Sequence, residues 1–229
     1  MRGTLVNVIA VLLGSTIGLL VGRRLPERLR RVITAGLGLS TLLIGMQMAL
    51  QAQRLLVVIA GMVLGGVTGE LLGIEAALER AGTRLQAWAR TGGGTFVAGF
   101  VTASLVFCVG PMTVIGSIQE GLTGNAEILY TKSLLDGVAS VAFASSLGVG
   151  VGFSVLTVVA IQVPLTLLGS RLTFLMLPDV LNALTATGGL LIVGIGLLLL
   201  EVKRLPVANF LPALPWAVLV AIGSRWLGW

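Results

Sequence analysis

Histidine is absent from this 229-residue sequence, cysteine occurs once, at Cys108, and charged residues make up only 10% of the chain. The shortage of cysteine and histidine excludes a disulfide framework and a zinc site of the Cys/His type. No Walker loop or nucleotide fingerprint occurs, so the chain alone is not expected to pump with ATP. We expect no cofactor and no metal.

The shortage of charge also excludes a soluble domain, in which about 25% of residues are charged. Hydrophobic residues make up 56% of this chain. The formal net charge of +6 does not indicate a nucleic-acid partner, because the basic residues lie in short segments beside apolar runs. The expected partner is therefore the lipid bilayer, with no nucleic acid.

Apolar runs of about 20 residues, the length that crosses a bilayer as a helix, recur along the whole sequence. They predict an all-α, polytopic transmembrane helix bundle of about eight spans. The count becomes seven if Gly148, Gly150 and Gly152 form a flexible joint instead of a turn. The predicted spans are 4–22, 32–51, 55–73, 96–119, 128–148, 151–175, 181–200 and 208–226.

Basic residues between the spans predict the orientation of the chain through the positive-inside rule. The first span lacks an Ala-x-Ala cleavage pattern and ends in an arginine cluster, which favours a retained anchor over a signal peptide. With the N-terminus outside, the basic groups after spans one, three and seven are all cytoplasmic. These groups are Arg23, Arg24, Arg28, Arg30 and Arg31; Arg80, Arg84 and Arg90; and Lys203 and Arg204.

We interpret residues 1–229 as one integral-membrane domain with an internal repeat. "LPERLRRVITAGLGLSTLLIGMQMAL" from Leu25 is similar to "LPDVLNALTATGGLLIVGIGLLLLEV" from Leu177. The match makes 1–73 a first repeat and 149–229 a second, inverted one (spans 1–3 and 6–8), although leucine and glycine are common enough for chance similarity. Residues 74–94 between them predict an interfacial amphipathic helix and linker, and 95–148 hold the central polar helices. Inverted repeats are typical of secondary transporters.

The fourth span contains Pro111, which lacks an amide hydrogen and would clash with the carbonyl of Phe107 in a continuous helix. The sequence therefore predicts either an ordinary kink or a true break near Gly110 and Pro111. A break would present half-helix ends that bind ions.

The fifth span contains Lys132 and Asp136, four residues apart on one helix face. An ionisable residue inside a span indicates a function, although a purely structural ion pair remains an alternative. At about 1.5 Å per residue, Asp136 and Pro111 reach the same depth. The candidate solute- or ion-binding residues are Asp136, Lys132, Ser133, Ser140, Cys108, Gly110, Pro111, Thr113, Ser117 and Glu120.

Asn7 and Gln47 are interpreted as links between helices more readily than as solute ligands. Small-residue stripes, formed by Gly14, Gly18 and Gly22 and by Gly61, Gly65 and Gly69, predict close helix packing.

Several segments resemble a prokaryotic family of integral-membrane proteins, domain of unknown function 554. They are "FCVGPMTVIGSIQEGLTG", "ILYTKSLLDG", "FASSLG", "LPERLR" and "LPVANFLPAL". The resemblance runs end to end and implies a prokaryotic cytoplasmic (inner) membrane protein, with transport as the function suggested for some members. It supplies no substrate and no catalytic residue.

Together these features predict a secondary transporter or channel for a small polar solute or ion, with its site between spans four and five. The alternative is a non-transporting scaffold or lipid-binding protein, and an enzyme is not expected. The sequence leaves open whether the chain forms a homo-oligomer.

Overall fold

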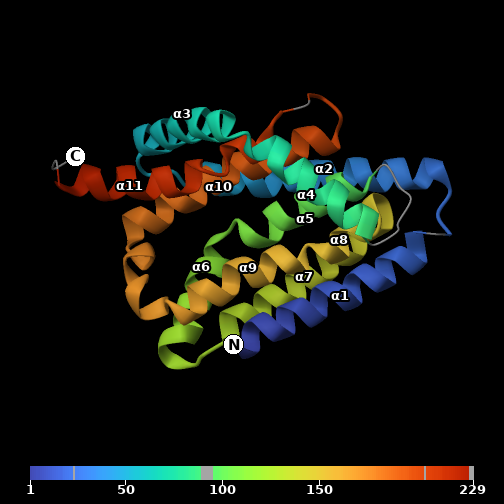
Figure 1. The fold of residues 1–229 in the computed structure, drawn as a ribbon, viewed down its shortest axis with the longest axis horizontal. Coiled ribbons are helices and arrows are strands. Elements are labelled where there is room, and N and C mark those ends of the chain that lie inside the picture. The colour runs from blue at the N-terminus through green and yellow to red at the C-terminus, as the bar shows by residue number, and fades with distance from the viewer. Residues whose placement is uncertain (23, 89–94, 204, 227–229) are drawn as a thin grey trace. The chain divides into compact units, whose positions relative to one another are not determined.

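The computed structural model of the chain describes residues 1–22, 24–88, 95–203 and 205–226. The predicted cytoplasmic residues Arg23, Arg90 and Arg204 lie outside these ranges. Within them, every regular element is a helix (Figure 1). The all-α prediction is therefore confirmed.

Each predicted span corresponds to a helix or to two consecutive helices. The elements are α1 (Arg2–Gly22), α2 (Glu27–Ala49), α3 (Leu55–Leu72), α4 (Ile74–Trp88), α5 (Phe96–Cys108), α6 (Pro111–Thr123), α7 (Glu127–Leu147), α8 (Gly150–Phe153), α9 (Val155–Leu167), α10 (Pro178–Leu199) and α11 (Ala213–Trp226), with short 3₁₀ turns η1 (Gly169–Arg171), η2 (Thr173–Met176) and η3 (Val207–Phe210). The predicted sixth span is too long, because α9 ends at Leu167 and gives way to 3₁₀ turns. Helix α4 covers most of the predicted amphipathic segment.

Six of the described helical segments are long and apolar enough to cross a membrane, and the α5–α6 pair makes a seventh if it counts as one span. Helix α7 has 21 residues, which is also enough to cross. Its charged and hydroxyl residues lower its apolar character. The chain is thus a multi-pass helical membrane protein.

The two predicted interruptions are both real. Helix α5 ends at Cys108, α6 begins at Pro111, and the pair is bent by 59°. Between α7 and α8, Gly148 adopts φ 83°, a left-handed conformation that favours glycine and reverses the chain. The fourth span is therefore broken, and the fifth and sixth are separate helices.

The chain forms two compact units, each built from segments that are distant in sequence. Unit 1 comprises Met1–Leu37, Glu79–Cys108 and Met112–Leu172; unit 2 comprises Gly38–Leu78, Val109–Pro111 and Thr173–Trp229. The repeat and the boundaries that it implies stay predictions.

Within unit 1, α1 and α7 pack along each other in the same direction (Figure 1). A methyl group added to Gly14, Gly18 or Gly22 would collide with the backbone of α7 at Gly137, Val141 or Ser145, respectively. The glycine stripe therefore permits close packing, as predicted.

Parallel packing requires an even number of reversals between α1 and α7. If α2, α3 and the α5–α6 pair each cross the membrane once, the chain reverses four times between α1 and α7, which makes these two helices parallel. A re-entrant α5–α6 pair would give three reversals and antiparallel helices.

Within unit 2, α3 and α11 pack in opposite directions. Added methyl groups at Gly61, Gly65 and Gly69 would meet Ala217, Ala213 and Asn209 in turn. These directions also agree with eight alternating crossings, because α3 would be the third span and α11 the eighth.

Candidate functional site

The predicted ion pair is formed inside unit 1. The Lys132 ammonium donates a hydrogen bond to the Asp136 carboxylate, one helical turn away on α7. Both residues are buried, with exposed fractions of 5% and 7%. A charged residue in a span costs at least about 2.5 kcal/mol on insertion scales, so these two residues raise the free energy of inserting the helix into the membrane.

Two further helices bring polar groups to this pair. Asn7, on α1, lies beside the Asp136 carboxylate, although neither of its amide atoms makes a hydrogen bond of ordinary geometry. Cys108, at the end of α5, lies within electrostatic reach of Lys132 and Asp136. The end of α5 therefore lies within electrostatic reach of the ion pair, and the equal depth of Pro111 and Asp136 stays a prediction.

The break itself is bridged by a side chain. The Thr113 hydroxyl donates to the Phe107 carbonyl at 3.2 Å, which satisfies an acceptor that a continuous helix would have used. Gly110 and Pro111, which were also predicted site residues, fall in the Val109–Pro111 segment of unit 2.

Two predicted hydroxyls are committed to their own helix. Ser133 donates to the Leu129 carbonyl at 2.6 Å and Ser140 donates to the Asp136 carbonyl at 2.7 Å. Such bonds within a helix are common for serine. Both hydroxyls face the same buried region but already have an acceptor.

Glu120 and Ser117 lie on the buried face of α6. One Glu120 oxygen, Oε1, accepts the backbone N–H of Gly3 at 2.9 Å and lies 2.8 Å from the amino nitrogen of Met1. The other oxygen, Oε2, is buried without a partner, as is the Ser117 hydroxyl one turn earlier. These contacts join the start of α1 to α6.

Sequence reasoning missed polar groups on α1 and α9. Gln162 is completely buried, and neither its amide nitrogen nor its oxygen has a hydrogen-bond partner. Thr166, one turn later, and Thr4, on α1, also have buried hydroxyls without partners. The available signal was the buried face of α9, on which Gln162 and Thr166 recur at helical spacing after Val158.

Unpartnered polar atoms are concentrated in unit 1. Of the twelve buried side-chain nitrogen and oxygen atoms without a hydrogen bond in the described ranges, eleven belong to unit 1 and one, the Thr187 hydroxyl, to unit 2. Native proteins leave few such atoms unpaired, and each one requires an explanation. Unit 1 therefore holds most of the unpartnered buried polar atoms, and they come from α1, α2, α6, α7 and α9.

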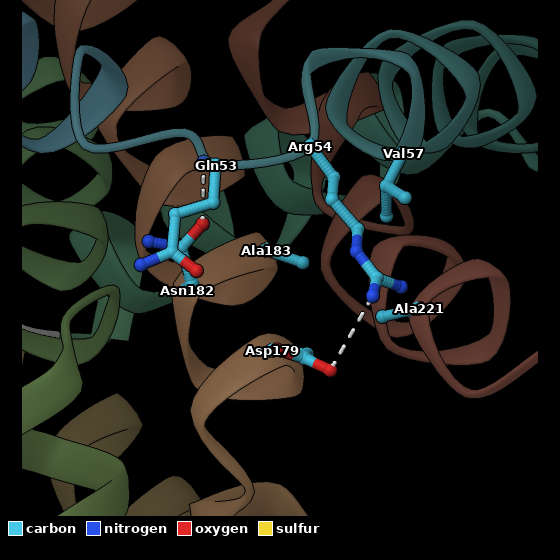
Figure 2. A pocket seen from close by; sticks show the side chains of 7 residues that line it. All are labelled: Gln53, Arg54, Val57, Asp179, Asn182, Ala183 and Ala221. Carbon is cyan, nitrogen blue, oxygen red and sulfur yellow. Dashed lines mark hydrogen bonds and ion pairs between the residues drawn. The ribbon is translucent and has the colours of Figure 1, made fainter. Parts of the chain in front are cut away.

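Unit 2 contains a polar hollow of the opposite kind, in which the groups pair with one another (Figure 2). Arg54 contacts Asp179 at 3.7 Å and donates to Ser224 at 2.9 Å. Asn182 accepts the backbone N–H of Gln53 at 2.9 Å and donates to the Gln51 carbonyl at 2.7 Å. These bonds fasten the α2–α3 connection to the start of α10, which is a structural role.

Comparison with known proteins gives a family but no activity. The family described as "Protein of unknown function (DUF554)" matches residues 2–222. The chain belongs to this family. One relative, the "Uncharacterized protein YqgA" of Escherichia coli (strain K12), is 32% identical over 99% of this chain and 98% of its own length. Another, the "Uncharacterized membrane protein YdfK" of Bacillus subtilis (strain 168), is 25% identical over 93% of each chain. No solved structure matches significantly.

The DUF554 match confirms the predicted family, and the printed name of the second relative agrees with a membrane protein. Because the relatives' names give no activity, the chemistry of the site has to be inferred from its residues. In the ranges that the structure describes, no group of three or more His, Cys, Asp or Glu side chains could hold a metal. The arrangement in unit 1 can instead bind through one ion pair, carboxamides and hydroxyls.

Proposed function

We propose that this DUF554 protein is a secondary transporter or channel for a small polar solute or ion, with its site in unit 1 around Lys132 and Asp136. The observation that carries the proposal is the buried ion pair on α7, in a unit that also holds unpartnered polar groups on α1, α6 and α9. An ion pair that only stabilised the fold would not need unpartnered polar groups in the same unit.

The break between α5 and α6 supports a site at this depth. Helix ends inside a span are tolerated where they are buried in protein or line a cavity, and transporters use them to bind solutes and ions. Cys108 ends α5 within reach of the ion pair. Because the chain has no histidine to activate a nucleophile, we propose transport and not enzymatic catalysis.

The proposal includes the orientation. The connection from α1 to α2 carries Arg24, and the first turns of α2 add Arg28, Arg30 and Arg31. The positive-inside rule then favours an N-terminus outside the cytoplasmic membrane.

The test is flux through the purified protein in liposomes. Potential-sensitive and pH-sensitive dyes would report Na⁺, K⁺, Cl⁻ and proton flux, and radiolabelled amino acids, glycine betaine and choline would report solute uptake. We expect Asp136→Asn to reduce the flux found at least about tenfold, because it leaves the Lys132 charge without its partner. Glu127→Gln, an exposed change on the same helix, is the control.

A second variant separates function from folding. Lys132→Met combined with Asp136→Leu removes both buried charges, which is commonly neutral or stabilising. We expect this protein to fold as the wild type does but to carry no flux. Flux that survives the double change would contradict the proposal, and absence of flux for every solute in the panel would favour a scaffold or lipid-binding protein.

A further inference from the structure

The two buried carboxamides of unit 1 are its most unusual side chains. Asn7 and Gln162 are both 0% exposed, and all four of their amide atoms lack a hydrogen bond of ordinary geometry. Each amide can donate two hydrogen bonds and accept two. The Asn7 amide adjoins the Asp136 carboxylate, whereas the Gln162 amide has no partner at all among the described residues. Leaving such groups without good hydrogen bonds in a membrane protein interior is costly, so their presence points to a ligand that pairs with them.

The packing registers place both amides near the ion pair. Helix α7 packs parallel to α1 with Gly137 beside Gly14, and α8 lies against α1 with Gly152 opposite Ser15. Counting back from these contacts at about 1.5 Å per residue puts Asn7, Lys132 and Gln162 within about one turn of the same level.

The side chains at this level face inward. Gln162 lies on the buried face of α9, and α9 contacts α1. Asn7 lies beside the Asp136 carboxylate. Three helices of one unit therefore contribute an amide, a second amide and the Lys132 end of the ion pair to one buried layer.

The charges of this layer select the kind of ligand. Lys132 and Asp136 neutralise each other, so a bare cation or anion would leave one of them without a counter-charge in a site with little water. A solute that carries both charges can replace both halves of the pair at once and keep the layer neutral. The unpaired amides offer donors and acceptors together, which suits such a solute and not a simple ion.

We infer that the site binds a small zwitterionic solute, one with a cationic nitrogen and a carboxylate, between α1, α7 and α9. The cationic nitrogen lies against Asp136, the carboxylate accepts from Lys132, and Asn7 and Gln162 supply the remaining hydrogen bonds. This inference rests on the proposed transport function and names its substrate class.

The experiment compares matched solutes in the liposome assay. Labelled glycine betaine and choline share a quaternary nitrogen and differ in that only betaine carries a carboxylate; the twenty labelled amino acids complete the zwitterion panel. We expect saturable uptake of at least one zwitterion and at least about tenfold less uptake of choline, Na⁺ and K⁺. Asn7→Leu and Gln162→Met should each lower zwitterion uptake about 10-fold to 100-fold, whereas Gln47→Met, at an exposed site on α2, should not.

The outcomes separate this inference from the proposed function. The inference is overturned if choline or an inorganic ion shows flux that depends on Asp136 while no zwitterion is taken up. The proposed transport function would still stand in that case. Zwitterion uptake that is unchanged in Asn7→Leu and Gln162→Met also overturns it. Absence of all flux contradicts both. Unfolding curves of both variants, which should show no loss of stability, exclude misfolding as the cause of reduced uptake.

Discussion

The two units of the molecule differ in whether their buried polar groups have hydrogen-bond partners. In unit 2, Asn209 donates to Glu70 at 2.6 Å and accepts the backbone N–H of Glu75 at 2.7 Å, which fastens the end of α3 and the start of α4 to η3. In unit 1, the equally polar Gln162 has no such partner, and Asn7 lies beside the Asp136 carboxylate without a hydrogen bond of ordinary geometry. The difference indicates that polar residues in unit 2 stabilise the fold, while those in unit 1 are kept at the expense of stability, as is common at functional sites.

The strongest test of this comparison is Asn209→Ala. The change removes two hydrogen bonds, one to the Glu70 carboxylate and one from the backbone N–H of Glu75. We expect a loss of about 2–3 kcal/mol in the free energy of unfolding, measured by circular dichroism during denaturation in detergent. Uptake per folded molecule should stay the same. Gln47→Ala, on the exposed face of α2, is the control, and a neutral effect of Asn209→Ala would contradict the structural role.

Gln162→Met should change stability in the opposite direction. Methionine has nearly the same shape, fills the same space and needs no hydrogen bonds, so the cost of two unpaired buried polar atoms disappears. We expect the free energy of unfolding to rise by about 1–2 kcal/mol in the same denaturation assay. A decrease would mean that the resting protein holds this amide through contacts of its own, and the contrast between the units would fail.

The features that sequence reasoning predicted depend on local chemistry. The helical segments follow from apolar length, the break from the missing amide hydrogen of Pro111, and the turn after α7 from Gly148. The ion pair follows from the four-residue spacing of Lys132 and Asp136. Each of these needs no knowledge of what packs against the helix.

The features that were missed depend on packing between distant segments. Gln162 is a single uncharged residue in an apolar run. Its position near other polar groups follows only from the contact between α9 and α1. Ser133 and Ser140 stay predicted ligands, although each hydroxyl donates to a carbonyl of its own helix. The division into two interleaved units also has no local signature.

The smallest expected effect concerns the exposed ion pair of unit 2 and distinguishes it from the buried pair of unit 1. Arg54 and Asp179 lie 3.7 Å apart with exposed side-chain fractions of 39% and 32%, so solvent and salt screen their attraction. We expect Arg54→Met to cost at most about 1 kcal/mol at low ionic strength, with most of the ion-pair contribution lost in 1 M NaCl. Lys132 and Asp136 are screened far less because they are buried, so the cost of Asp136→Asn should hardly change with salt. Equal salt dependence for the two variants would show that water and ions reach the unit 1 pair as freely as the surface pair, and the contrast in burial would not hold in solution.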